Sequence, residues 1–176
     1  MDRNLGASQV ATSSTDAAAY GDLYQWGRAA DGHQIRTSGT TSTLSTTDAP
    51  GHANFILASS DWRSPLNTNL WQGENGVNNP CPSGFRIPTE AEFNAEKATW
   101  SSQYSAGAYA SPLKFTAAGL REGSNGSLDS VGSHGDYWSS SVGGIYSRTL
   151  VFSSGWVADI NSYNRANGHS VRCIKN

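Results

Sequence analysis

The sequence predicts an α+β fold, with two short helices around a small antiparallel sheet and long ordered loops between them. Alternating apolar and polar residues, separated by turn signals, run through Val131–Cys173, which is the pattern of antiparallel strands. A capping-box sequence that begins at Thr89 predicts a helix. Only 15% of the residues are charged, and Ser, Thr, Gly, Asn, Trp and Tyr are frequent. That composition suits sheets, ordered loops and contact surfaces.

The length and charge limit the possible functions. The 176 residues are expected to form one domain, 1–176. A formal net charge of −2 provides no basic field for nucleic acid, and no apolar run is long enough for membrane insertion. Aromatic residues mixed with Ser, Gly and Asn are typical of adaptable binding surfaces. The alternative is a loop-rich extracellular β domain without a particular site.

The first helix is predicted at Asp16–Arg28, with Asp16 or the preceding residue as its cap. Apolar residues recur from Tyr20 at i, i+3 and i+4, which is helical spacing. Residues 29–79 show no such periodicity and are expected to pack as a long ordered loop insertion. Trp62 and Trp71 are expected to anchor this insertion to the core.

The second helix is predicted to run from Thr89 to about Gln103, because Thr89-x-x-Glu92 forms a capping box. Phe93 and Trp100 are expected to be its buried residues. The glutamates in its first turn suit a helix N-terminus, where carboxylates are favoured, better than they suit catalysis. A short strand, Phe85–Ile87, precedes the helix.

The second half of the chain supplies the predicted sheet. A β region at 114–121 comes first, and the strands that follow are 146–152, 156–160 and 169–174. In the strand 146–152, Leu150 and Phe152 share one side and are expected to face the core. Ser147, Thr149 and Val151 share the other side, which is expected to face solvent or a ligand. A glycine-closed loop at 161–168 leads into the last strand.

The two cysteines, Cys81 and Cys173, lie far apart in the sequence. A disulfide between them would close a long loop and stabilise the fold by roughly 4 kcal/mol. The alternative is a pair of buried free thiols. They do not form a zinc site alone, because no Cys-x-x-Cys or histidine lies at ligand spacing.

Five motifs, taken in order, resemble a known family. They are M-D-R-N-L-G, G-D-L-Y-Q-W-G, C-P-S-G-F-R-I-P-T-E-A-E-F, Y-W-S-S-S and S-V-R-C. This set resembles the Fibrobacter succinogenes major paralogous domain. That family in turn resembles the C-type-lectin-like fold of formylglycine-generating enzymes and of the variable proteins of diversity-generating retroelements. The resemblance covers nearly the whole chain and is specific for fold but weakly specific for ligand.

The resemblance implies a function. Similar domains bind peptides in calcium-dependent bacterial surface adhesins of the RTX type. The protein is therefore expected to be a non-catalytic module of a larger adhesin chain, monomeric and extracellular at the bacterial cell surface. It would bind peptide or protein termini on a host or neighbouring cell, with calcium as cofactor. The alternatives are a retroelement-diversified receptor domain and a carbohydrate-binding lectin domain that takes a glycan.

The predicted ligand-binding residues come from the strand alternation together with the resemblance to diversified retroelement segments, which also suggests a position near Ile145. Trp156 and Tyr163 are expected to be exposed, whereas Trp138 and Tyr146 are expected to pack in the core. The full predicted set is Asp136, Tyr137, Thr149, Val151, Trp156, Ala158, Asn161, Tyr163 and Asn164.

Calcium ligands are sought among loop residues with oxygen donors, the donor type that calcium prefers. The candidates are Asn125, Asp129, Asp136, Asp159 and Asn161. No EF-hand loop or RTX nonapeptide is present, and the alternative is that these side chains cap turns.

An enzyme is not expected. The formylglycine-generating relatives depend on active-site cysteines, whereas both cysteines here occupy positions that look structural, and no third thiol exists. No Ser/His/Asp motif, P-loop or H-E-x-x-H sequence is present. The four histidines, His33, His52, His134 and His169, are expected at the surface or in loops.

Overall fold

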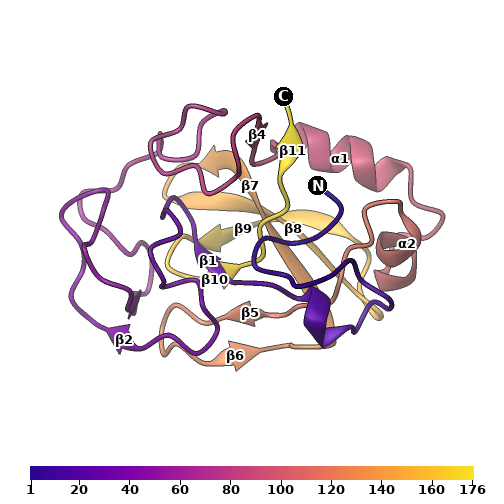
Figure 1. Cartoon of the computed structure of the whole chain (residues 1–176), viewed down its shortest axis with the longest axis horizontal. Coiled ribbons are helices and arrows are strands. Elements are labelled where there is room, and N and C mark those ends of the chain that lie inside the picture. Colours follow the sequence, from indigo (N-terminus) through magenta and orange to yellow (C-terminus); the bar gives the residue numbers. More distant parts are fainter.

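The computed structural model describes residues 1–176 and confirms the α+β class. Its two α-helices are α1 (Glu90–Ala98) and α2 (Ser105–Ala110), and both lie at one side of the molecule (Figure 1). The three longest strands, which lie between residues 134 and 164, cross the centre of the molecule (Figure 1). The long connections of the first half of the chain lie on the opposite side from the helices (Figure 1).

The central sheet is an antiparallel meander in the order β7-β8-β9. Its strands are β7 (His134–Gly143), β8 (Tyr146–Ser153) and β9 (Asp159–Asn164). The prediction for the strand 146–152 is confirmed by β8. The strand predicted at 156–160 begins three residues later than expected, at Asp159, because Trp156 and Val157 belong to the connection between β8 and β9.

Shorter strands surround this sheet. The strand predicted at 169–174 is wrong as a single element, because its two ends pair in different sheets. A four-stranded sheet has the order β1-β10-β5-β6, β4 pairs with β11, and β2 pairs with β3 in parallel. These strands are β1 (Tyr24–Gln25), β2 (Thr40–Thr41), β3 (Phe55–Ile56), β4 (Phe85–Arg86), β5 (Leu120–Arg121), β6 (Leu128–Asp129), β10 (Gly168–His169) and β11 (Ile174–Lys175).

Both faces of the central sheet are largely covered. Leu150 and Phe152 belong to the apolar cluster that also contains Phe93 of α1, as the alternation predicts. The expectation for the opposite side of β8 is only partly met, because Ser147 and Thr149 are completely buried. Distant segments of the chain pack on that side around a second cluster that contains Trp138.

The helix predicted at Asp16–Arg28 is wrong. Asp16 does act as a cap, but it opens only a single 3-10 turn, Ala17–Ala19. Gly21 then takes a φ of +67°, and a Cβ atom there would lie 2.2 Å from the carbonyl oxygen of Leu5. A left-handed residue held against a neighbouring backbone cannot continue a helix. Tyr24 therefore lies in strand β1.

Helix α1 begins where its sequence predicts. Thr89 and Glu92 form the reciprocal capping box, and Glu92 also pairs with Arg86 at 2.6 Å. The helix ends at Ala98, earlier than expected, but Phe93 and Trp100 are buried as predicted. Helix α2 is short, and no helix was predicted at its position.

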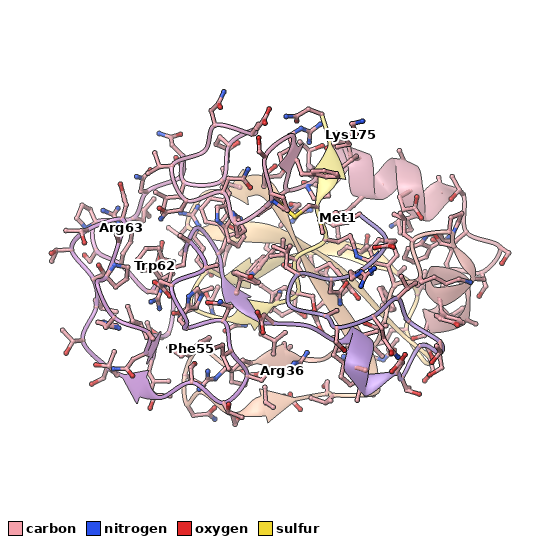
Figure 2. The ribbon with its side chains drawn as sticks, viewed as in Figure 1. Met1, Arg36, Phe55, Trp62, Arg63 and Lys175 are labelled. Atoms are coloured by element: carbon pink, nitrogen blue, oxygen red, sulfur yellow. A yellow bond between two sulfur atoms is a disulfide. The ribbon has the colours of Figure 1, made fainter.

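The insertion 29–79 is fixed to the rest of the molecule by buried side chains. Trp62 and Trp71 are both completely buried, as predicted, and Trp62 lies on the side of the molecule that this segment occupies (Figure 2). The Trp62 indole N–H donates to the carbonyl of Trp26 at 2.7 Å. The amide Nε2 of Gln25 donates both to Ile56 in the insertion and to Ala166 near the end of the chain.

A disulfide joins Cys81 to Cys173. Of the two alternatives for these cysteines, the disulfide is therefore confirmed and the pair of free thiols is wrong. Their Cα atoms are 5.9 Å apart, and 92 positions separate them along the chain. No helix is both long and apolar enough to cross a membrane.

Candidate functional site

A pocket of about 60 Å³ opens where the central sheet meets the connection between β8 and β9. It collects five of the nine predicted ligand-binding residues: Asp136, Val151, Trp156, Asn161 and Tyr163. The remaining residues that line it are His134, Phe152 and Val157.

The strand register explains why these residues meet. Asp136 of β7 pairs with Val151 of β8, and Val151 pairs with Asp159 of β9. Directly opposed residues of antiparallel strands present their side chains on the same face. Asn161 and Tyr163 follow Asp159 at intervals of two along β9, so they share that face too. Alternation along the sequence thus becomes one surface across three strands.

Trp156 is the most exposed aromatic side chain of the site. Its side chain is 67% exposed, and its indole ring lies against the imidazole of His134 with ring centroids 5.1 Å apart. The backbone N–H groups of Gly155 and Trp156 donate to the hydroxyl of Ser153 at 3.1 Å and 2.9 Å. These bonds order the turn and hold the indole at the mouth of the pocket.

Asp136 supplies the charge of the site. Its side chain lines the pocket but is only 1% exposed, and its Oδ2 has no hydrogen-bond partner in the chain. Burial, with smaller contributions from the carboxylates of Asp129 and Glu122, raises the pKa of Asp136 to about 7. The carboxylate is therefore destabilised where it stands, because neither solvent nor a chain donor compensates it.

A buried histidine, His169, packs against the pocket residue Tyr163. The imidazole of His169 meets the ring of Tyr163 edge-on, with centroids 5.0 Å apart. Its Nδ1 lies 3.3 Å from the hydroxyl of Thr149, and its Nε2 has no partner in the chain. Burial lowers the pKa of His169 to about 3, so the ring is neutral near pH 7. The prediction that all four histidines lie at the surface or in loops is wrong for His169, which is completely buried in strand β10. His33 lies in a turn of the insertion, as predicted, but is completely buried as well.

The polar groups at the pocket are not used by the fold. The side chains of His134, Asn161 and Tyr163 line the pocket, and none of them makes a hydrogen bond to another part of the chain. Burial, followed by the charge of Asp136, raises the pKa of the Tyr163 phenol, so this hydroxyl keeps its proton at neutral pH. The pocket therefore offers a carboxyl, an amide, an imidazole and a phenol to a ligand.

Four predicted residues do not reach the pocket. The Tyr137 hydroxyl accepts from the backbone N–H of Thr116 at 2.9 Å on the helix side of the sheet, because strand alternation turns it away from Asp136. Thr149 and Ala158 are buried by packing. Asn164 is half-buried and follows Tyr163 directly, so it points to the opposite face.

The far end of the β7–β8 hairpin is separate from the pocket. Ile145 lies in its turn and is 49% exposed. Tyr146, which the sequence placed in the core, is 40% exposed because it pairs with Gly143 and Asn164 at the end of the sheet.

The five calcium candidates do not meet in one place. Asn125 accepts from the backbone N–H and the hydroxyl of Ser127 within a turn, and Asp129 accepts from the neighbouring N–H of Ser130. Asp159 lies 3.6 Å from the ammonium of Lys97. Asp136 and Asn161 are the candidates that share the pocket. No group of three or more His, Cys, Asp or Glu side chains is placed to hold a metal ion.

A larger cavity of about 500 Å³ lies between helix α1 and strand β11. Apolar side chains such as Phe93 and Leu113 line it together with the buried Arg172. Arg172 is engaged there, since it donates to Asn4 and to the carbonyl of Leu113. No sequence pattern indicated this cavity, because its lining comes from both chain ends and from the middle of the chain.

The small pocket therefore remains the place where the predicted binding residues, an exposed indole and an uncompensated carboxylate come together. Comparison of the chain with protein-family models, with curated proteins and with solved structures finds no match.

Proposed function

We propose that the protein is a non-catalytic ligand-binding module with a C-type-lectin-like fold, which binds a peptide or protein through the pocket around Asp136, Trp156 and Tyr163. One observation carries this proposal. An ordered turn presents a tryptophan that is 67% exposed beside a pocket whose polar side chains make no hydrogen bonds to the rest of the chain.

The energetics favour binding at this place. Tryptophan and tyrosine are the usual anchors of protein contacts and contribute about 2 kcal/mol or more when they are central. Val157, next to Trp156, is 57% exposed and extends the apolar surface. An apolar anchor beside a few polar groups is the usual composition of a contact patch. A partner that covers Trp156 would also enclose the pocket.

We place this module outside the cell, as part of a bacterial surface adhesin. The Cys81–Cys173 disulfide supports an oxidising compartment, because such bonds are rare where thiols are kept reduced. The five motifs that resemble the paralogous-domain family support the adhesin context.

Calcium belongs to the proposal in a restricted form. Asp136 and Asn161 bring two oxygen donors to one pocket, and the orphaned carboxylate oxygen of Asp136 fits a cation. Calcium takes about six to eight oxygen ligands, so this pair alone is an incomplete site. Ligand oxygens or water would have to complete it.

A carbohydrate ligand is the second candidate, and the same exposed indole favours it. A flat aromatic ring presented to solvent can cover the apolar face of a sugar, and the amide of Asn161 lies in the adjoining pocket to bind hydroxyl groups. The two candidates differ in whether a peptide or a glycan occupies the same surface.

A peptide array and a glycan array, each probed with and without calcium, test the proposal. The wild type is compared with Trp156→Ala, with Tyr163→Ala and with the control Tyr146→Ala, which removes an exposed aromatic at the far end of the sheet. We expect signals on the peptide array that fall at least tenfold, by about 1.4 kcal/mol or more, in the two pocket variants alone. Ligands that bind all three variants equally would refute the proposal, provided that thermal melting shows each variant to be folded.

A further inference from the structure

We propose that the pocket binds an alkylammonium group, either that of a lysine side chain or that of a peptide N-terminus, with Asp136 as its counter-ion. This inference rests on the proposed function and specifies which chemical group of the partner enters the pocket. The carboxylate of Asp136 lines the pocket, is almost fully buried and has an oxygen that no donor of the chain satisfies.

The uncompensated carboxylate of Asp136 makes the pocket favourable for a cation. No lysine or arginine lines it. Lys97, on the neighbouring helix, is engaged by Asp159 at 3.6 Å and donates to the carbonyl of Ala158 at 3.1 Å. A buried carboxylate without a partner is costly, whereas one that accepts from an ammonium group is stabilised by a charge-assisted hydrogen bond. A ligand cation would supply what the chain leaves out.

The walls suit the same group. The aromatic rings of Trp156, Tyr163 and His134 line the pocket, and the faces of tryptophan and tyrosine attract cations. The amide oxygen of Asn161 and the phenol oxygen of Tyr163 can accept further ammonium protons. An alkylammonium group has three donors, so one carboxylate and two neutral acceptors match it.

The size of the pocket selects the end of a chain and not a whole ligand. About 60 Å³ is far below the roughly 300–1,000 Å³ of pockets that enclose a whole small-molecule ligand. This space holds an ammonium group with the methylene next to it. The rest of the partner would then lie outside, against the exposed indole of Trp156.

Binding is expected to depend on pH through Asp136. Its pKa of about 7 is set first by burial and then by Asp129 and Glu122, which approach from the β5–β6 hairpin. A cation at the carboxylate favours its ionised form, so ammonium binding should release a proton and strengthen as pH rises through 7. The other groups that can carry charge at the pocket are His134 of β7 and Tyr163 of β9.

Titration calorimetry with three short peptides tests the inference. Acetyl-Gly-Lys-Gly-amide offers a lysine side chain, Gly-Gly-Gly-amide offers an N-terminal amine, and acetyl-Gly-norleucine-Gly-amide is the uncharged match of the first. We expect one or both amines to bind at about pH 8 and to bind at least about tenfold more weakly at about pH 5, where Asp136 is protonated. Whichever amine binds identifies the source of the ammonium group.

Matched variants assign the effect to one side chain. Asp136→Asn should weaken amine binding about tenfold or more and remove its pH dependence. Asp159→Asn changes a carboxylate on the same face, two strands away, and should leave binding within about twofold, because that group is exposed and paired with Lys97. His134→Gln should keep the pH dependence.

The outcomes separate this inference from the proposed function. Equal binding of the norleucine peptide, or an unchanged affinity in Asp136→Asn, would overturn the inference. The same holds if neither amine binds, or if the wild type binds calcium through Asp136 and ignores both amines. If array ligands still depend on Trp156 in any of these cases, the module stands as proposed and only the ammonium assignment fails.

Discussion

The indole of Trp138 lies flat against the imidazole of His169, with ring centroids 4.1 Å apart and 14° between the ring planes. The indole N–H donates to the carbonyl of Tyr24 at 2.7 Å, and the ring of Tyr163 meets the same imidazole edge-on. A continuous stack of rings thus connects the core to the wall of the pocket.

Replacing His169 with alanine should destabilise the protein by about 3 kcal/mol, because it removes a completely buried ring between two aromatic neighbours and leaves a cavity. Urea unfolding followed by fluorescence measures the loss. His52→Ala, at a half-buried loop position, is the control and should cost less than about 1 kcal/mol. Similar losses in the two variants would show that the stack contributes little.

Replacing Asp136 with asparagine should stabilise the protein at high pH but weaken the binding proposed above. The folded-state pKa of Asp136, about 7, is raised above the ordinary value of 3.8. The favourable contribution of the protonated group is therefore complete below about pH 4 and is lost as pH rises through 7. Asparagine does not ionise, so the stability of the variant relative to the wild type should increase between about pH 4 and pH 8.

Chemical unfolding of both proteins across that range measures the difference. His33 and His169, whose pKa values burial lowers to about 4 and about 3, change the stability of both proteins alike, so their effect cancels. A difference that stays constant with pH would show that Asp136 does not titrate between the folded and unfolded states as its burial implies.

Replacing Gly21 with alanine should cost more than about 1 kcal/mol. The φ of +67° is strained for any residue with a Cβ atom, and the new atom would lie 2.2 Å from the carbonyl oxygen of Leu5. Gly144 also has a positive φ, +65°, but nothing lies near its missing Cβ. Thermal melting of Gly21→Ala beside Gly144→Ala isolates the close contact, and equal melting points would contradict its importance.

Replacing Cys81 and Cys173 together with serine should lower the free energy of unfolding by roughly 4 kcal/mol, since the bond closes a long loop in the unfolded chain. The expected effect appears in urea unfolding of the double variant against the oxidised wild type. Reduction of the wild type should shift its midpoint in the same direction. An unchanged midpoint after complete reduction would show that the cross-link does not constrain the unfolded chain.

Local patterns predicted the parts of the fold that local chemistry controls. The capping box at Thr89 and the alternation of Leu150 and Phe152 gave the start of α1 and one face of β8 correctly. The apolar spacing after Tyr20 predicted a helix that the structure does not contain. The helix is prevented by the close approach of Leu5 to Gly21, which is a tertiary contact. The spacing of residues along the sequence does not predict contacts between distant segments.

The candidate site shows the same division. Strand alternation placed Val151 on the exposed face and the family resemblance added Asp136 and Tyr163, and all three line one pocket. Thr149 lies on that same face but is buried, because His169 from a distant strand covers it. Alternation tells which side chains share a face, whereas the coverage of that face depends on how remote segments pack. The larger cavity beside α1 escaped prediction for that reason.

The hydroxyl of Ser153 holds the turn before Trp156 through backbone N–H groups alone. Backbone bonding of this kind is indifferent to which side chain position 156 carries. A different residue there could project from the same framework without rebuilding it, so the partner of this protein could change over evolution while its scaffold stays the same.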